Sequence, residues 1–192
     1  MNNIYIVGFM GTGKTTAGKE IAGRKAWNFI DLDELIELRE RRRIADIFAR
    51  SGEPYFRKAE QAALKEVARE KNFVVACGGG IVIDKENIKI MRESGYIVCL
   101  RASPDEILKR TGSSKDRPLL NVPDPKKQIT HLLKLRAPFY ARADSSIDTT
   151  GLSAAEVASK VMKLISQKKK RLRRQLKKLA LRREPVNFFK DT

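Results

Sequence analysis

Gly8-Phe9-Met10-Gly11-Thr12-Gly13-Lys14-Thr15 is the segment from which the fold of this chain is most directly inferred. It matches G-x-x-x-x-G-K-[ST] in full, follows an apolar, β-branched run and opens a helical pattern. In such a loop the backbone N–H groups and the positive end of the helix surround phosphate oxygens, the lysine reaches the β- and γ-phosphates, and the last hydroxyl binds Mg²⁺. A turn that only caps a helix is the weaker alternative, because motif and context agree. The stretch predicts a nucleoside triphosphate site.

Strand-like and helical patterns alternate on both sides of this loop. Short apolar or β-branched runs predict strands at residues 4–7, 28–31, 73–77, 96–100 and 145–148. Helical patterns lie at residues 14–23, 33–41, 44–50, 53–71, 84–94, 103–110, 125–142 and 153–165. Alternation of this kind implies parallel strands joined by right-handed crossovers. The sequence therefore predicts a three-layer α/β/α fold with a five-stranded parallel sheet over residues 1–166.

Composition excludes several classes of protein. The chain has 192 residues, 42% hydrophobic and 33% charged, which suits one well-buried domain. Its apolar stretches are far shorter than the roughly 20 residues of a spanning helix, and we expect no signal peptide before the first strand. Cys77 and Cys99 lie in apolar, strand-like runs, which favours reduced thiols over a disulfide framework. We therefore expect a cytoplasmic protein with no membrane span.

About half of the net charge of +17 lies in the last 26 residues, where 11 lysines and arginines face two acids. We expect residues 167–192 to form a basic C-terminal tail, helical or disordered. Leu172, Leu176 and Leu179 are spaced as one face of a helix. A solvated extension of the last helix is one interpretation. Packing on the domain or on another subunit, nucleic-acid binding and contact with an anionic membrane are the others.

A second unusual segment is the loop at residues 112–124, which is rich in Gly, Ser, Pro and Asp. A loop of that length in a compact domain is typical of either a lid or a disordered segment. Composition leaves the two open.

Acidic residues follow the second predicted strand, and glycines follow the third. Asp31 and Asp33 would lie beside the phosphate loop, because ligands gather at the carboxyl ends of parallel strands. There one carboxylate could support Mg²⁺ and a second could accept a substrate proton, or Asp33 and Glu34 could merely begin the next helix. Residues 78–80 are all glycine and could present backbone to a substrate or form a flexible turn. Taken singly, Arg57, Arg117 and Arg136 fit surface charges.

Together these segments resemble shikimate kinase. The matching segments are GFMGTGKTT at 8–16, DLD at 31–33, GEPYFR at 52–57, GGG at 78–80, RPLL at 117–120 and LRAPFY at 135–140. They occur in that family's order and spacing over about residues 2–165. The resemblance implies a nucleoside-monophosphate-kinase-like fold with a lid. It also implies phosphorylation of the 3-hydroxyl of shikimate by ATP with Mg²⁺.

The same resemblance implies roles for individual residues. Asp33, Lys14 and Arg117 would be catalytic, with Asp33 orienting or deprotonating the hydroxyl and Arg117 closing from the lid. Thr15 and Asp31 would serve the metal. The carboxylate of shikimate would be clamped by Arg57 and Arg136, against the backbone of Gly79 and Gly80. The nucleotide-binding set would be Gly11, Thr12, Gly13, Lys14, Thr15, Thr16, Arg110 and Arg117.

Two segments depart from the family pattern. Ala141-Arg142 follows Tyr140 where an acid is common, which we expect to alter a helix surface that carries no assigned role. Residues 149–152 offer mainly backbone to the adenine pocket. Two rival functions remain open: another small-molecule phosphate-loop kinase, such as a gluconate kinase, and a non-catalytic interaction protein. We expect a monomer that takes shikimate and ATP.

Overall fold

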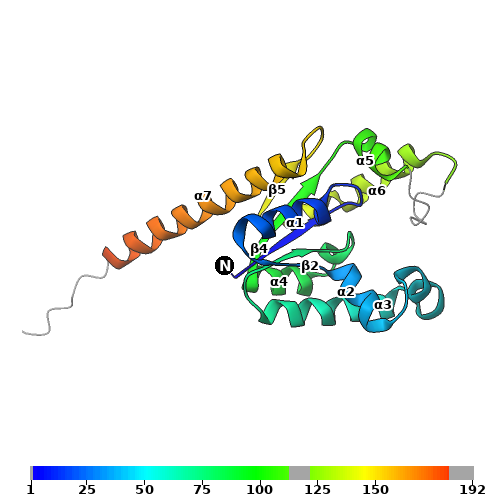
Figure 1. Ribbon diagram of the computed structural model, residues 1–192, viewed down its shortest axis with the longest axis horizontal. Coiled ribbons are helices and arrows are strands. Elements are labelled where there is room, and N and C mark those ends of the chain that lie inside the picture. Colours follow the sequence, from blue (N-terminus) through cyan, green and yellow to red (C-terminus); the bar gives the residue numbers. More distant parts are fainter. Residues whose placement is uncertain (1, 113–121, 182–192) are drawn as a thin grey trace, which may run out of the picture.

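The computed structural model, which describes residues 2–112 and 122–181, contains one five-stranded sheet with helices on both faces (Figure 1). The strands lie in the order β2-β3-β1-β4-β5, and every neighbouring pair is parallel. Their bounds are β1 Asn3–Gly8, β2 Asn28–Asp31, β3 Phe73–Ala76, β4 Gly95–Arg101 and β5 Ser145–Asp148. This is the predicted architecture, and each strand ends within one residue of the range expected from the sequence.

Helices fill the connections, and several begin at the capping groups that the sequence offers. Ser103 accepts a hydrogen bond from the N–H of Glu106 at the start of α5 (3.2 Å), and Ser153 and Glu156 form a reciprocal capping box at the start of α7. The helices are α1 Lys14–Lys25, α2 Leu32–Glu40, α3 Ile44–Arg69, α4 Lys85–Ser94, α5 Pro104–Thr111, α6 Pro125–Tyr140 and α7 Ala154–Leu181, with a 3₁₀ helix η1 at Ile81–Ile83.

The central strand, β1, lies between two hydrophobic cores, one on each face of the sheet. Tyr5 and Val7 face the core formed with α2 to α6, whereas Ile4 and Ile6 face the core formed with α1 and α7. Successive side chains of a strand point to opposite faces, so a strand covered on both sides must be apolar throughout. Cys77 and Cys99 are buried and unpaired, as expected for reduced thiols.

Helix α3 differs in detail from the two helices predicted at 44–50 and 53–71. It runs as one element, but Gly52 interrupts it with φ 77° and ψ 169°, which is not helical backbone. A positive φ of this kind favours glycine. The predicted break is therefore present as a kink inside α3. The 3₁₀ helix η1 is not predicted, because three residues are too few to show a periodicity.

Two predicted segments fall partly outside the described residues. Of the proposed lid at 112–124, residues 113–121 lie outside them, and so does Arg117. Helix α7 continues past residue 167 to Leu181, so the described part of the basic tail is helical and continuous with the domain. None of the helices in the described ranges combines the length and apolar composition that crossing a bilayer requires.

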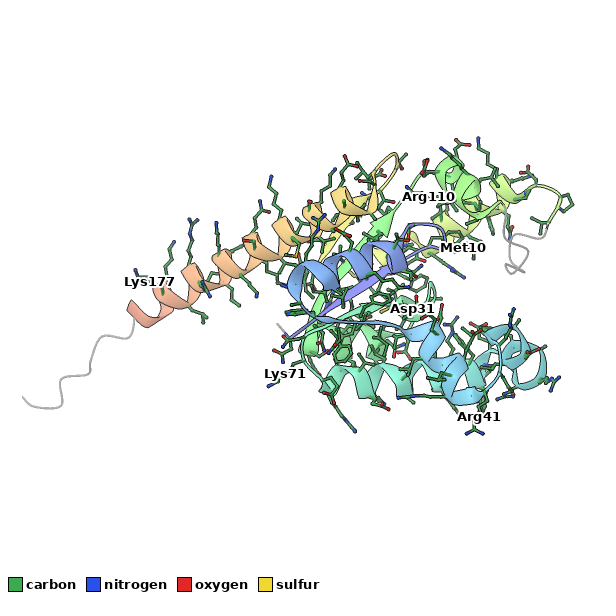
Figure 2. The ribbon with its side chains drawn as sticks, viewed as in Figure 1. Met10, Asp31, Arg41, Lys71, Arg110 and Lys177 are labelled. Atoms are coloured by element: carbon green, nitrogen blue, oxygen red, sulfur yellow. The ribbon has the colours of Figure 1, made fainter. Side chains whose placement is uncertain are left out.

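Parallel strands bring the predicted site segments to one edge of the sheet. The phosphate loop follows β1, Asp31 ends β2, and residues 78–80 come soon after β3, the strand between β1 and β2. Figure 2 shows Met10 of the loop, Asp31 and Arg110 at this same edge, with Lys177 far away on α7. The fold therefore collects the candidate residues at the carboxyl ends of the strands, where ligands bind in open α/β sheets.

Candidate active site

The phosphate loop curls because its glycines adopt backbone conformations that other residues avoid. Gly11 and Gly13 have φ of 76° and 88°. The loop is closed by Thr12, whose hydroxyl donates to the carbonyl of Phe9 (2.7 Å), and the amine of Lys14 also donates to that carbonyl (3.1 Å). Helix α1 starts at Lys14 with Gly13 as its N-cap and no acid in its first turn. The positive end of α1 is thus available to an anion.

Thr15 and Asp31 meet beside this loop. The Thr15 hydroxyl donates to Oδ2 of Asp31 (2.8 Å), while Oδ1 of Asp31 accepts the N–H of Asp33 (3.1 Å) and so caps α2. Asp31 therefore caps the next helix and also holds a carboxylate oxygen against the phosphate loop, and its role toward a metal stays a prediction. A hydroxyl and a carboxylate side by side are hard oxygen donors, the type that Mg²⁺ prefers.

Asp33 has an unsatisfied carboxylate. Its Oδ1 is buried and accepts no hydrogen bond from any described residue. Burial, followed by the charge of Asp31, raises the pKa of Asp33 to about 6, and the Lys14 amine opposes that rise. A Cβ at Gly78 would lie 2.8 Å from this Oδ1. Asp33 therefore faces the Gly78–Gly80 turn with a free acceptor.

A second buried acid, Glu60, anchors Arg57 on the other side of the turn. Glu60 is 1% exposed, and its Oε2 accepts from Nη1 of Arg57 (2.7 Å), one helical turn away on α3. Nη2 of Arg57 also donates to Glu53 (2.9 Å). Burial raises the pKa of Glu60, and the adjacent Arg57 lowers it. Sequence reasoning missed Glu60. Its spacing of three residues from Arg57 was the available signal.

Helix α6 supplies the third wall of the site. A Cβ at Gly79 would lie 3.4 Å from Nη1 of Arg136 and 3.7 Å from the hydroxyl of Tyr140, which donates to the Gly79 carbonyl (2.9 Å). The Arg136 guanidinium lies 5.6 Å from the centroid of the Phe9 ring, so it also borders the phosphate loop. Burial raises the pKa of Tyr140 to about 12. Tyr140 could not be assigned from its sequence position, because its partner is a backbone carbonyl from a distant segment.

The three glycines are the point where these groups meet. A Cβ at Gly80 would lie 2.5 Å from Nη2 of Arg57, and a Cβ at Gly78 would lie 2.9 Å from Oε1 of Glu60. A side chain at Gly78 or Gly80 would therefore displace charged groups. The structure thus brings five predicted substrate residues to one turn: Asp33, Arg57, Gly79, Gly80 and Arg136.

Arg110 lies on the nucleotide side of the phosphate loop. Its guanidinium donates to the Gly11 carbonyl (3.3 Å) and to the carbonyl of Thr149 (2.9 Å), and its Nε pairs with Glu106 (2.8 Å). Thr149 is buried and donates its hydroxyl to the Thr12 carbonyl (3.2 Å). Arg110 and Thr149 therefore fix the loop to the end of β5. Mainly backbone was expected from residues 149–152, and the contact of the Thr149 side chain was not predicted.

A phosphate loop, a buried carboxylate and two arginines at one sheet edge define a phosphate-loop kinase for a small anionic acceptor. A model of the shikimate kinase family matches residues 10–166. The chain belongs to the shikimate kinase family.

Individual relatives agree with that assignment. The shikimate kinase of Thermoanaerobacter pseudethanolicus is 46% identical over 88% of this chain and 99% of its own, and that of Caldanaerobacter subterraneus is 48% identical over 85% and 95%. A structure of the Acinetobacter baumannii shikimate kinase in complex with shikimate has a TM-score of 0.83 and 37% identity, covering 88% and 95% of the two chains. A gluconokinase from Sinorhizobium meliloti (TM-score 0.57, 17% identical) shares the fold alone.

The ion pair of Arg57 and Glu60 leads to a stability prediction. Arg57→Met should lower the free energy of unfolding by about 2 kcal/mol at pH 8, because it leaves the buried Glu60 carboxylate without its cation. Arg57→Met/Glu60→Leu should recover most of that loss, since no buried charge remains. Urea unfolding of both variants measures the difference. A double variant that is less stable than Arg57→Met would contradict the pairing.

Proposed function

We propose that the chain transfers the γ-phosphoryl group of ATP to the 3-hydroxyl of shikimate, giving shikimate 3-phosphate and ADP. The observation that carries this proposal is the meeting of the unsatisfied Asp33 oxygen with Arg57 and Arg136 at one turn beside the phosphate loop. An acceptor with a hydroxyl and a carboxylate is complementary to that set. The bound shikimate of the Acinetobacter baumannii relative supports the choice of acceptor.

Phosphate binding follows from the loop geometry. Backbone and side chains of Gly11, Thr12, Gly13, Lys14, Thr15 and Thr16 would surround the phosphates. Lys14 would exchange its contact with the Phe9 carbonyl for the β- and γ-phosphate oxygens. The guanidinium of Arg110, already bonded to the loop, would border the adenine side. Arg117, from the proposed lid, would neutralise charge on the transferring group.

Mg²⁺ fits the pair formed by Thr15 and Asp31. The ion keeps several waters and shares phosphate oxygens, so it needs few protein ligands. The described residues contain no group of three or more His, Cys, Asp or Glu side chains that could hold a metal ion by themselves. When bound, it neutralises phosphate charge. Asp31 would support it, directly or through water.

The acceptor hydroxyl belongs at Asp33. A carboxyl with a pKa of about 6 is mostly ionised at neutral pH, and its free oxygen can accept the hydroxyl proton. As the acceptor oxygen bonds to the γ-phosphorus, the bond from phosphorus to the ADP oxygen breaks. Positioning and charge neutralisation do most of this work, because phosphoryl transfer needs little covalent help from the protein.

The substrate carboxylate belongs between Arg57 and Arg136. Arginine offers a planar fork of donors that matches a carboxylate. Glu60 and Glu53 hold Arg57, while Gly79 and Gly80 leave room for the ring against backbone. We propose a monomer as the working unit and the cytoplasm as its location.

A coupled assay for ADP release tests the function directly. ATP turnover should rise at least 100-fold on addition of shikimate and should not respond to gluconate. Equal rates with both acceptors, or none with shikimate, would refute the proposed substrate.

Asp33→Asn should lower kcat at least 100-fold, because an amide cannot accept the hydroxyl proton. The affinity for ATP, measured by calorimetry, should stay within about twofold, because Asp33 faces the acceptor side. Glu66→Gln, which neutralises an exposed acid on α3, serves as the matched control and should keep wild-type kcat. Wild-type turnover in Asp33→Asn would remove Asp33 from the mechanism.

Arg136→Met should raise the KM for shikimate roughly 10- to 100-fold, the cost of losing a charge-assisted hydrogen bond. The KM for ATP should change far less. Arg24→Met, at a surface ion pair on α1, is the control and should change neither constant. Equal increases in both KM values would instead indicate a general distortion of the site.

A further inference from the structure

The C-terminal half of α7 has no counterpart in the family match, which ends at residue 166. We call residues 167–178 of this helix the basic extension. Figure 1 shows α7 continuing well beyond the sheet that its first half covers. All twelve residues of the basic extension are exposed. A helix of this length outside a core needs a reason other than packing within the domain.

One apolar stripe runs along both halves of α7. Val161 and Ile165 are buried against the sheet, and Leu172 and Leu176 continue the same face at helical spacing. These two leucines are 52% and 58% exposed, because the domain ends before they are reached. The extension therefore presents the face that elsewhere in α7 packs against protein.

Cations cover the remaining faces of the basic extension. It carries eight lysines and arginines, and the chain has no acid between residues 157 and 181. Lys168 is bound to the domain by Asp144 (2.9 Å) and lies over the Tyr96 ring (4.3 Å). Beyond it stand seven further cations: Lys169, Lys170, Arg171, Arg173, Arg174, Lys177 and Lys178.

The charge determines which partner fits. A second copy of the extension is disfavoured, because two faces without acids would repel each other. Nucleic acid would use the cations but leave both leucines in water, and the extension holds no aromatic residue for base stacking. A bilayer with anionic headgroups uses both features, because leucines enter the acyl boundary while lysines and arginines contact the headgroups. We propose that the basic extension docks α7 on an anionic lipid surface.

Cosedimentation with vesicles tests this docking on the full chain. The protein should partition onto phosphatidylcholine vesicles that contain phosphatidylglycerol, and not onto phosphatidylcholine alone. Lys177→Gln/Lys178→Gln should weaken partition about 30-fold, since each lysine near an anionic surface contributes about fivefold. Lys160→Gln/Lys163→Gln removes the same charge from the packed half of α7 and should have a much smaller effect. Shikimate phosphorylation reports that the variants are folded.

The leucines separate a membrane from nucleic acid. Leu172→Ser/Leu176→Ser should weaken partition onto anionic vesicles at least tenfold, whereas Leu38→Ser, at an exposed leucine of α2, should not. Unchanged partition in the leucine pair would overturn the proposal. It would also be overturned if the wild-type chain ignored anionic vesicles and bound duplex RNA or DNA instead.

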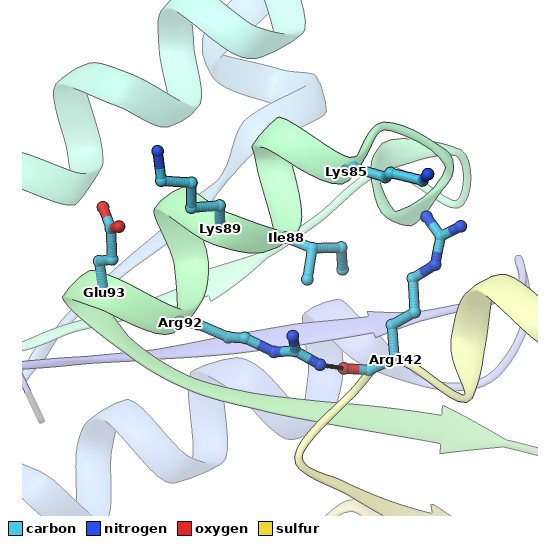
Figure 3. A pocket seen from close by; sticks show the side chains of 6 residues that line it. All are labelled: Lys85, Ile88, Lys89, Arg92, Glu93 and Arg142. Atoms are coloured by element: carbon cyan, nitrogen blue, oxygen red, sulfur yellow. Dashed lines mark hydrogen bonds between the residues drawn. The ribbon is translucent and has the colours of Figure 1, made fainter.

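A separate observation concerns Arg142, where the sequence departs from the family. Helix α6 ends at Tyr140, so Arg142 does not alter a helix surface as expected. Its Nη1 donates to the carbonyls of Val82 and Ile83, both at 3.1 Å, and its own carbonyl accepts from Arg92 (2.7 Å). Figure 3 shows the link from Arg92 and the Arg142 guanidinium turned toward Lys85, at the start of α4.

These contacts hold the segment that directly follows the Gly78–Gly80 turn. Val82 and Ile83 belong to η1, which begins directly after Gly80. The Tyr140 hydroxyl donates to the Gly79 carbonyl at one end of the segment 79–83. Arg142, two residues after Tyr140, binds the other end of that segment. We infer that Arg142 is a positioning residue that sets Gly79 and Gly80 against Arg136. This inference rests on the proposed function.

Steady-state kinetics test the bracing role. Arg142→Ala should raise the KM for shikimate about five- to tenfold, with kcat and the KM for ATP within about twofold. Arg142→Lys should recover part of the loss, and Lys85→Ala, in the same pocket, should match the wild type. Equal rises in both KM values, or none, would overturn the inference. A wild-type chain without shikimate-dependent turnover would instead refute the proposed function.

Discussion

Gly78 and Gly80 lie so close to charged groups that a side chain would displace them: a Cβ would lie 2.8 Å from Oδ1 of Asp33 at Gly78 and 2.5 Å from Nη2 of Arg57 at Gly80. A Cβ at Gly79 would make ordinary contact with Arg136 at 3.4 Å. Two acids and two arginines approach the Gly78–Gly80 turn from α2, α3 and α6. Asp33 and Glu60 each keep one buried carboxylate oxygen that has no hydrogen-bond partner among the described residues.

The arginines of the site are held by protein partners, whereas Asp33 has an oxygen that is not held by any described residue. Arg57 is held by Glu60 and Glu53, and Arg110 by Glu106 and two backbone carbonyls. Such cations lose little conformational entropy when an anion arrives, because they are already ordered. Asp33 has an oxygen without a protein partner, which leaves it free for a substrate hydroxyl. Paired arginines and an acid with a free oxygen suit a substrate that carries an anionic group at one end and a hydroxyl at the other.

Local patterns were enough to predict the five strands, the phosphate loop and the residues that resemble the family's motifs. Each of these is written in consecutive residues or in a fixed helical spacing. Tyr140 and Thr149 were missed because their partners come from distant segments. Glu60 was missed although Arg57 is three residues away, because the sequence does not show that this acid is buried beside Gly78. Arg142 shows the same limit, since its bonds to η1 depend on where α6 ends. Arg117 and the proposed lid stay predictions, as does the division at residue 167.

The kink at Gly52 divides α3 into two bodies with different attachments. The second half packs into the core through Ala63, Leu64 and Val67. Arg57 and Glu60 lie on this packed half. The first half contacts the second through Phe48, whose ring centroid lies 4.8 Å from that of Phe56. Phe48 is 38% exposed. The first half is also anchored, because Ile47 is fully buried in the same core and the N–H of Ile44 donates to Glu37 (2.8 Å). Both sides of the kink are therefore fixed, and Gly52 redirects the chain between them so that Arg57 reaches the Gly78–Gly80 turn.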